Sequence, residues 1–388
     1  MTTFYSGRDY GRFYLGEISS EYYRYCHIFS FASLTPTGDL IPRHQYVDGW
    51  GNTGVTWAGV ENMLRNMKNW GAYPVFAIWL ANLDMSDAEW NTQRRSSPMS
   101  IPNPQPKITY AGLEAFLSRL NAILVSLDFE NMIFIPCWEF NQTATDTLQN
   151  RREWCWGEDI AGSYRDWDLD PAAYNTFMEI LVRARNAVAP RVRIGVAPDG
   201  MAGKVNDASV DRRVWGGGVN PDMDWEWSWT RQWGGRDGFF HWLDGFRKCN
   251  FDFDAFGVSQ YPRFSSSDPL ASDAALIDQF LGEQWNRRIV ELVGLQGKSF
   301  MLYEYNLLGT PRANATFIEN TYKSVMAKLD AGLVNYESIG WYLGFRDAEA
   351  WTRCNELALL YSGYTPPTPP IDLGTLALIA LMAIVILS

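Results

Sequence analysis

The chain has 388 residues, of which 47% are hydrophobic and 20% are charged, a composition typical of a folded protein rather than a disordered one. The net charge of −11, without any cluster of lysine and arginine, argues against a nucleic-acid-binding protein, because phosphate recognition needs a basic surface. Five cysteines without a CxxC pair and three histidines without an HExxH motif argue against zinc chemistry and against a disulfide framework.

The first residues, "MTTFYSGRDYGRFYLG", lack the basic and apolar regions of a secretory signal peptide. Beyond them, short apolar runs alternate with amphipathic segments, which is the pattern of repeated βα units. The expected strands span residues 12–18, 27–34, 73–80, 131–141, 191–199, 253–262, 298–306 and 338–346. Helices are expected over 110–127, 172–188 and 314–332, the last with Gly332 as its C-cap.

This order predicts an α/β fold, a (β/α)8 TIM barrel with long βα loops. A doubly wound open sheet is the competing layout, but it would normally carry a glycine-rich phosphate turn after an early strand, and the sequence has none. The link between the first two expected strands is only "SSEYYRYC", so the first unit is irregular.

The long segments 35–53, 81–109, 142–170 and 200–238 each follow an expected strand, and barrel enzymes place their active sites on such βα loops. They include the tryptophan-rich stretches "REWCWGED" and "MDWEWSWTRQWGG". Aromatic residues make up 15% of the chain. A large aromatic core is one interpretation; a cleft in which indole rings stack on sugars is the other.

Two glutamates stand at the ends of expected strands: Glu139 in "FIPCWEFNQ" after the fourth and Glu304 in "FMLYEYN" after the seventh. A single strand-end glutamate is more often a structural hydrogen-bond acceptor. Two carboxylates from opposite sides of one barrel mouth are what retaining glycoside cleavage requires, with a separation of about 5 Å. The pair is therefore the candidate catalytic centre.

The motifs "PCWEFN", "WCWG" and "LYEYN" resemble the clan of retaining glycosidases on (β/α)8 barrels, most nearly glycoside hydrolase family 26, the β-mannanase-like enzymes. The resemblance covers most of residues 11–346. It implies that Glu139 is the general acid/base and Glu304 the nucleophile. The sequence departs from the family at Trp138, where the family has histidine and where contacts to the cleaved sugar would change, and at Asn306, where it has glycine.

The same resemblance implies further substrate contacts. Tyr261 would hydrogen-bond the nucleophile, with packing at the barrel rim as the alternative, and Asn141 would bind near the acid/base or a sugar hydroxyl. Trp156 would line the cleft, with a core role as the alternative. Trp341 resembles the aromatic residue that stacks under the cleaved sugar, although the strand's alternation leaves Tyr342 as the other choice.

The C-terminus differs from the rest of the chain. A proline-rich linker, 363–370, separates the barrel domain, 1–362, from the apolar segment 371–388. As a helix this segment would span roughly 27 Å, close to a bilayer's hydrocarbon thickness. It has no polar face, as a buried core helix would have. The sequence thus predicts a single-pass C-terminal transmembrane helix, and no lysine or arginine after Arg353 defines its orientation.

The predicted function is an endo-acting retaining glycoside hydrolase that cleaves a β-linked polysaccharide, mannan-like or xylan or glucan, and is attached to a lipid membrane by its tail. This chemistry needs neither a metal nor a cofactor. The alternative is a non-catalytic carbohydrate-binding or structural surface protein on the same barrel, for instance in a membrane-containing virus particle.

Overall fold

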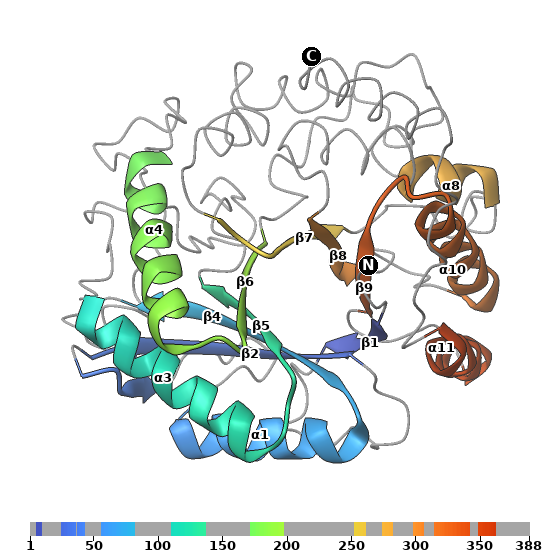
Figure 1. Ribbon diagram of the computed structural model, residues 1–388. Helices are drawn as coiled ribbons and strands as arrows, with labels where there is room; N and C mark the ends of the chain where they lie inside the picture. The colour runs from blue at the N-terminus through green and yellow to red at the C-terminus, as the bar shows by residue number, and fades with distance from the viewer. Residues whose placement is uncertain are drawn as a thin grey trace, which may run out of the picture.

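The computed structural model describes residues 5–9, 25–35, 37–42, 56–81, 110–136, 171–197, 252–260, 274–281, 298–305, 314–341 and 348–361. Most of its strands run parallel in one curled sheet (Figure 1). These strands are β1 (Tyr5–Asp9), β2 (Tyr25–Leu34), β4 (Tyr73–Ala81), β5 (Met132–Pro136), β6 (Val192–Val196), β7 (Ala255–Gln260), β8 (Ser299–Tyr305) and β9 (Tyr336–Trp341).

The sheet closes on itself. From β2 through β4 to β9, each parallel strand pairs with the next along the chain. Strand β1 then pairs in parallel with β9, where Tyr5 lies opposite Ser338, and also with β2, where Arg8 lies opposite Cys26. Closure removes the free edges that an open sheet would expose. The expected parallel α/β barrel arrangement is therefore present in the strands.

The strand that closes the barrel is not among the expected strands. The strand that joins β9 to β2 is Tyr5–Asp9, earlier in the chain than the expected 12–18, which lies outside the described residues. Its sequence, YSGRD, is short and polar, so an apolar-run criterion misses it. Partners on both sides supply its main-chain hydrogen bonds. Each of the other expected strands overlaps a strand of the barrel.

A short strand, β3 (Leu40–Pro42), pairs antiparallel with the end of β2. It lies within 35–53, where only a loop was expected. The turn before it is closed by Thr35, whose Oγ1 accepts from the Asp39 amide at 2.9 Å. Gly38 in this turn has a φ of 82°, a conformation that L side chains adopt with strain.

Helices lie outside the strands (Figure 1). Their bounds are α1 (Trp57–Trp70), α3 (Tyr110–Ser126), α4 (Pro171–Val188), α8 (Ala274–Leu281), α10 (Ala315–Asp330) and α11 (Ala348–Tyr361). Thr56 and Asn314 cap the N-termini of α1 and α10 by accepting amide hydrogen bonds. Gly332, expected to end α10, follows its cap residue Ala331 with a φ of 66°.

Aromatic rings fill much of the layer between the helices and the sheet. On one side, Phe76 and Phe134 from the strands meet Phe116 of α3. On the other, Tyr305 of β8 stacks on Phe317 of α10, with ring centroids 5.8 Å apart. Among the described residues, part of the chain's aromatic excess is therefore core packing.

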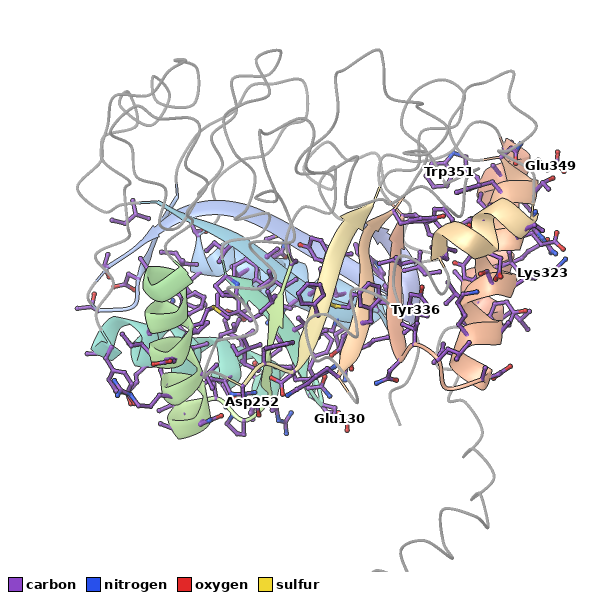
Figure 2. All side chains as sticks on the ribbon, turned by 90° about the horizontal axis from the view of Figure 1, so that it is seen from above. Glu130, Asp252, Lys323, Tyr336, Glu349 and Trp351 are labelled. Atoms are coloured by element: carbon purple, nitrogen blue, oxygen red, sulfur yellow. The ribbon has the colours of Figure 1, made fainter. Side chains whose placement is uncertain are left out.

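All barrel strands point the same way, so their carboxyl ends share one rim. In Figure 2, Glu349 at the start of α11 lies toward one end of the barrel, and Glu130 and Asp252, which precede β5 and β7, lie at the other. Within the described ranges, no helix is long and apolar enough to cross a membrane; the segment 371–388 lies outside them.

Candidate active site

Strand β8, which contains Glu304, and strand β5, which precedes Glu139 in the chain, end on the same rim. Glu304 is the second-last residue of β8, and Glu139 comes three residues after the end of β5 in the sequence. Around the ring, only β6 and β7 separate these strands on one side. Glu139 itself, together with Trp138, Asn141, Trp156 and Tyr261, lies outside the described residues.

The inside of the barrel can be distinguished from its helix-facing outside by packing. Phe256, Phe300 and Leu302 belong to the core between sheet and helices. Met301 and Tyr303 are fully buried but do not belong to that core. Because side chains alternate along a strand, these two residues face the barrel interior.

Glycines allow side chains of neighbouring strands to pack closely in this interior. A Cβ on Gly257 of β7 would lie 3.1 Å from both Met301 Cε and Tyr303 Cβ, and 3.5 Å from the Cβ of Ala197. A Cβ on Gly195 of β6 would lie only 2.6 Å from Ile133 Cγ2 of β5. The interior between β5 and β8 is thus packed closely enough that a single methyl group forces a neighbour to move.

An extra residue in β8 changes its alternation just before the rim. Against β7, Val258 pairs with Leu302 but Ser259 pairs with Glu304; against β9, Leu302 pairs with Ile339 but Tyr305 pairs with Trp341. Over this stretch β8 therefore has one residue more than each neighbour, which is a β-bulge. Its effect is visible in Tyr305, which packs against α10 on the same side as Leu302, three positions earlier.

The bulge sets the register of Glu304. In a regular strand Glu304 would share the helix-facing row of Leu302, two positions before it. With the bulge, its backbone pairs with Ser259 instead. Ser259 is two positions after Gly257, so Glu304 occupies a position in the interior row of the barrel.

The structure corrects the role expected for Trp341. Its side chain is fully buried, and its Nε1–H donates to Tyr322 Oη of α10 at 3.3 Å. Its ring also packs against Tyr305 and Phe317. An indole enclosed between β9 and α10 has no face on which a sugar could stack. The alternative residue, Tyr342, lies outside the described residues.

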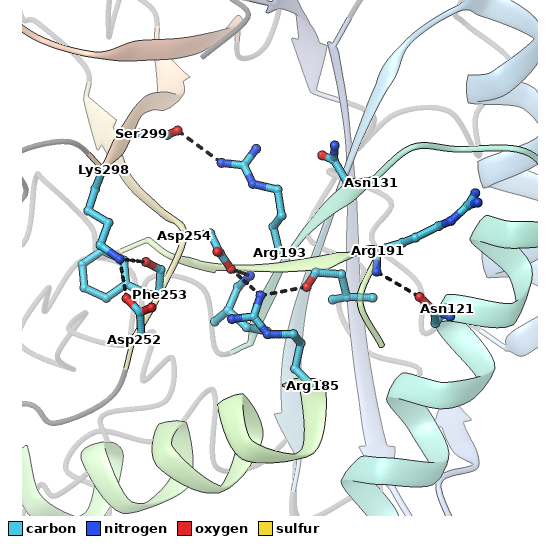
Figure 3. Close-up of polar contacts among 12 residues, drawn as sticks. Asn121, Asn131, Arg185, Arg191, Arg193, Asp252, Phe253, Asp254, Lys298 and Ser299 are labelled. Atoms are coloured by element: carbon cyan, nitrogen blue, oxygen red, sulfur yellow. Dashed lines mark hydrogen bonds and ion pairs between the residues drawn. The ribbon is translucent and has the colours of Figure 1, made fainter. Parts of the chain in front are cut away.

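Polar residues that sequence reasoning missed meet inside the opposite, amino-terminal end of the barrel. Arg193 of β6 forms a bidentate ion pair with Glu337 of β9, with Nη2 to Oε2 at 2.8 Å. The same guanidinium donates to Tyr73 Oη of β4 at 2.8 Å and to Ser299 Oγ of β8 at 3.2 Å. Figure 3 shows the Arg193–Ser299 contact.

The charges of Arg193 and Glu337 compensate each other within this cluster. Burial opposes the charge on Arg193, but hydrogen bonds and the carboxylate of Glu337 outweigh it and raise the pKa of the guanidinium. The side chain of Glu337 is 2% exposed, and both of its carboxylate oxygens accept hydrogen bonds from Arg193. The cluster joins four strands and offers no free acceptor for chemistry, so it stabilises the barrel floor. The signal in the sequence was a charged residue in each of two apolar strands, "RVRIGV" and "YESIGW".

A second set of contacts holds the strands around this floor (Figure 3). Arg185 of α4 pairs with Asp254 at 2.7 Å, and Asp254 also accepts the amide of Ile194 at 2.7 Å. Lys298 binds Asp252 and donates to the carbonyl of Phe253 at 2.7 Å. No group of histidine, cysteine and acidic residues that could hold a metal occurs in the described part of the chain.

Comparison with known proteins supports the fold. No protein-family model matches the sequence, and no curated protein sequence matches it. Among solved structures, the glycoside hydrolase family 44 endoglucanase from Clostridium acetobutylium ATCC 824 is similar, with a TM-score of 0.51 and 9% identity over 93% of this chain and 76% of that chain.

Two further structures are also similar. The GH53 catalytic domain of Ignisphaera aggregans has a TM-score of 0.47 and 11% identity, and covers 92% of this chain and 96% of its own. GH26C from Muricauda sp. MAR_2010_75 has a TM-score of 0.40 and 14% identity, and covers 89% of this chain and 80% of its own. The similarity to the family 44 endoglucanase supports the barrel fold described above and nothing finer, so it does not assign the chain to family 26.

Proposed function

We propose that the protein is a retaining, endo-acting glycoside hydrolase that cleaves a β-linked polysaccharide. The observation that carries this proposal is the register of Glu304. A bulge moves it from the helix-facing row to the interior row of β8, on the rim that β5 also reaches. Bulges beside active sites commonly re-aim a side chain.

The proposed reaction is a double displacement. The ionised carboxylate of Glu304 attacks the anomeric carbon, while the protonated carboxyl of Glu139 gives its proton to the leaving glycosidic oxygen. The C–O bond to the leaving sugar breaks as the bond to Glu304 forms. Glu139, now a carboxylate, then takes a proton from water, and the resulting hydroxide displaces Glu304 from the anomeric carbon. The anomeric configuration is retained.

Side chains around the pair would bind the substrate. We assign Tyr261 to hydrogen-bonding of the nucleophile and Asn141 to a sugar hydroxyl. Trp138 and Trp156 provide flat apolar surfaces for neighbouring sugar rings, which suits a polymer better than a single sugar. With Trp341 packed into the core, we assign the platform under the cleaved sugar to Tyr342, the next residue along the chain.

The test is hydrolysis of mannan, xylan and mixed-linkage β-glucan by the full chain, measured as new reducing ends. Glu139→Gln is expected to lower kcat/KM by about 10² to 10⁴, the usual contribution of general acid–base catalysis. Glu304→Gln is expected to reduce cleavage to background. Glu349→Gln, an exposed position on α11, is the matched control and leaves the rate unchanged.

The outcome that would overturn the proposal is cleavage by Glu304→Gln at the wild-type rate. NMR of the first product anomer provides an independent check, because inversion would exclude the covalent intermediate. Tight binding of a polysaccharide by the wild-type chain without any cleavage would favour the non-catalytic alternative instead.

We further propose that 371–388 anchors the barrel domain to a membrane through the linker 363–370. The support is in the sequence, an apolar segment without charge after a proline-rich spacer. Deleting 366–388 is expected to release the protein from lipid vesicles in a flotation assay while leaving the unfolding midpoint unchanged. A large fall in that midpoint would show that the segment belongs to the core.

A further inference from the structure

The β8 bulge is held inside the barrel by the packing of Tyr303 against Gly257. The additional residue lies within Tyr303–Glu304, between the two helix-facing residues Leu302 and Tyr305. Tyr303 is fully buried in the interior, where it lies against Gly257 of the neighbouring strand. The side chain directly before Glu304 is therefore enclosed on the inside of the barrel, and that on the other side, Tyr305, is enclosed under α10.

Gly257 makes this packing possible. It lies opposite Met301, and any Cβ there would stand 3.1 Å from Tyr303 Cβ. That distance is shorter than ordinary van der Waals contact between carbons. The Cβ of Tyr303 is attached directly to the backbone of the bulge, so it cannot yield by a rotamer change alone. A methyl group at 257 must therefore move the β8 backbone relative to that of β7 by a few tenths of an ångström.

We infer that Gly257 and Tyr303 are positioning residues for Glu304. Together they hold the bulge in the one arrangement that keeps Glu304 in the interior row, without either residue touching the reacting atoms. This inference rests on the proposed hydrolase function, because it concerns the same site. It adds that catalysis depends on an inter-strand contact below the rim.

The consequence is a specific kinetic pattern. Substrate is bound by residues of the rim, so displacement of β8 leaves KM nearly unchanged. The attack on the anomeric carbon, in contrast, depends on sub-ångström placement, and misplacement by about 1 Å can lower a rate by about 10²-fold. On that scale a shift of a few tenths of an ångström corresponds to a several-fold loss, so Gly257→Ala is expected to lower kcat by about 4- to 10-fold, with KM changed by less than about 3-fold.

The experiment measures kcat and KM of the full chain and of five variants on whichever of mannan, xylan or mixed-linkage glucan the wild type cleaves. The variants are Gly257→Ala, Tyr303→Phe, Tyr303→Leu, Ile339→Val and Glu304→Gln. Tyr303→Phe keeps the ring against Gly257 and is expected to retain kcat within about 3-fold, whereas Tyr303→Leu loses the ring and follows Gly257→Ala. Ile339→Val, in the helix-facing core, controls for a general loss of packing.

The outcomes separate the two proposals. Wild-type kcat in a folded Gly257→Ala or in Tyr303→Leu, alongside an inactive Glu304→Gln, overturns the positioning inference and leaves the proposed function standing. A fully active Glu304→Gln, or an inactive wild type, overturns the proposed function and this inference with it. If Gly257→Ala does not fold, the comparison of Tyr303→Leu with Tyr303→Phe decides: equal kcat values contradict the inference, and rescue by phenylalanine supports it.

Discussion

Replacing Glu337 with glutamine tests how much the buried ion pair at the barrel floor contributes to stability. The amide keeps the shape of the side chain but removes its charge. Arg193 then faces a neutral partner. Its remaining partners, Tyr73 and Ser299, are neutral as well. Because an arginine guanidinium keeps its proton in proteins, Arg193 cannot relieve the imbalance by becoming neutral.

The expected cost follows from the exposure of the two side chains. Glu337 is 2% exposed and Arg193 is 23% exposed. Removing one partner of a buried pair typically costs about 3 to 5 kcal/mol. Since water still reaches part of Arg193, we expect the lower end, about 3 kcal/mol. The measurement is urea-induced unfolding, with the free energy taken from the midpoint and slope of the transition.

Two further variants define the control. The exposed pair of α1, Arg65 with Glu61, has a single contact of 2.8 Å, and Glu61→Gln is expected to cost no more than about 0.5 kcal/mol. The double variant Arg193→Met with Glu337→Leu removes both charges, so it should be less destabilised than Glu337→Gln alone. A loss below about 1 kcal/mol in Glu337→Gln, or a double variant that is less stable than the single one, would refute the reasoning.

Three other substitutions have defined outcomes. Trp341→Phe should lower the free energy of unfolding by about 1 to 3 kcal/mol, through lost packing and the lost bond to Tyr322, and leave KM unchanged; a raised KM would return Trp341 to the substrate site. For Asp278, burial opposes ionisation, but hydrogen bonds from Lys328 and Ser324 outweigh it and hold its pKa below the usual 3.8. The carboxylate therefore stabilises the fold above about pH 4 and loses this effect as the pH falls through the lowered pKa, so Asp278→Asn should flatten the acid limb of a stability–pH curve; an unchanged limb would exclude that role. Thr56→Ala removes the N-cap of α1 and should cost about 1 kcal/mol in thermal or urea unfolding, whereas Thr56→Ser, which retains the hydroxyl, should cost much less; equal losses would show that the cap bond is unimportant.

Much of the barrel could be predicted from sequence because its strands are buried on both faces. Such strands appear as nearly continuous apolar runs, as in "YPVFAIWL", and these can be read without knowing their partners. Strand β1 could not be found this way, since YSGRD carries no apolar signal and is a strand only because two neighbours pair with it.

The site was less predictable, because alternation along a strand is reset by bulges that the sequence does not mark. Trp341 was assigned to the substrate site from the family resemblance, with Tyr342 as the other choice, and its observed pairing with Tyr305 follows from the extra residue in β8 that the sequence does not mark. The bulge in β8 also changes the pairing of Glu304, which it places opposite Ser259, in the interior row. The pairing of Arg193 with Glu337 joins residues far apart in the chain, and neither local sequence names its partner.

The pairing of Tyr5 with Ser338 has a consequence for biosynthesis. At about 5 to 20 residues per second, a ribosome makes the closing strand roughly 20 to 70 s after the opening one. Throughout that interval β1 lacks its second neighbour, and the nascent chain holds an incomplete sheet with apolar surface that solvent or a chaperone must cover. The native state therefore becomes reachable only once translation has passed Trp341, and chains released earlier are candidates for aggregation rather than for partial function.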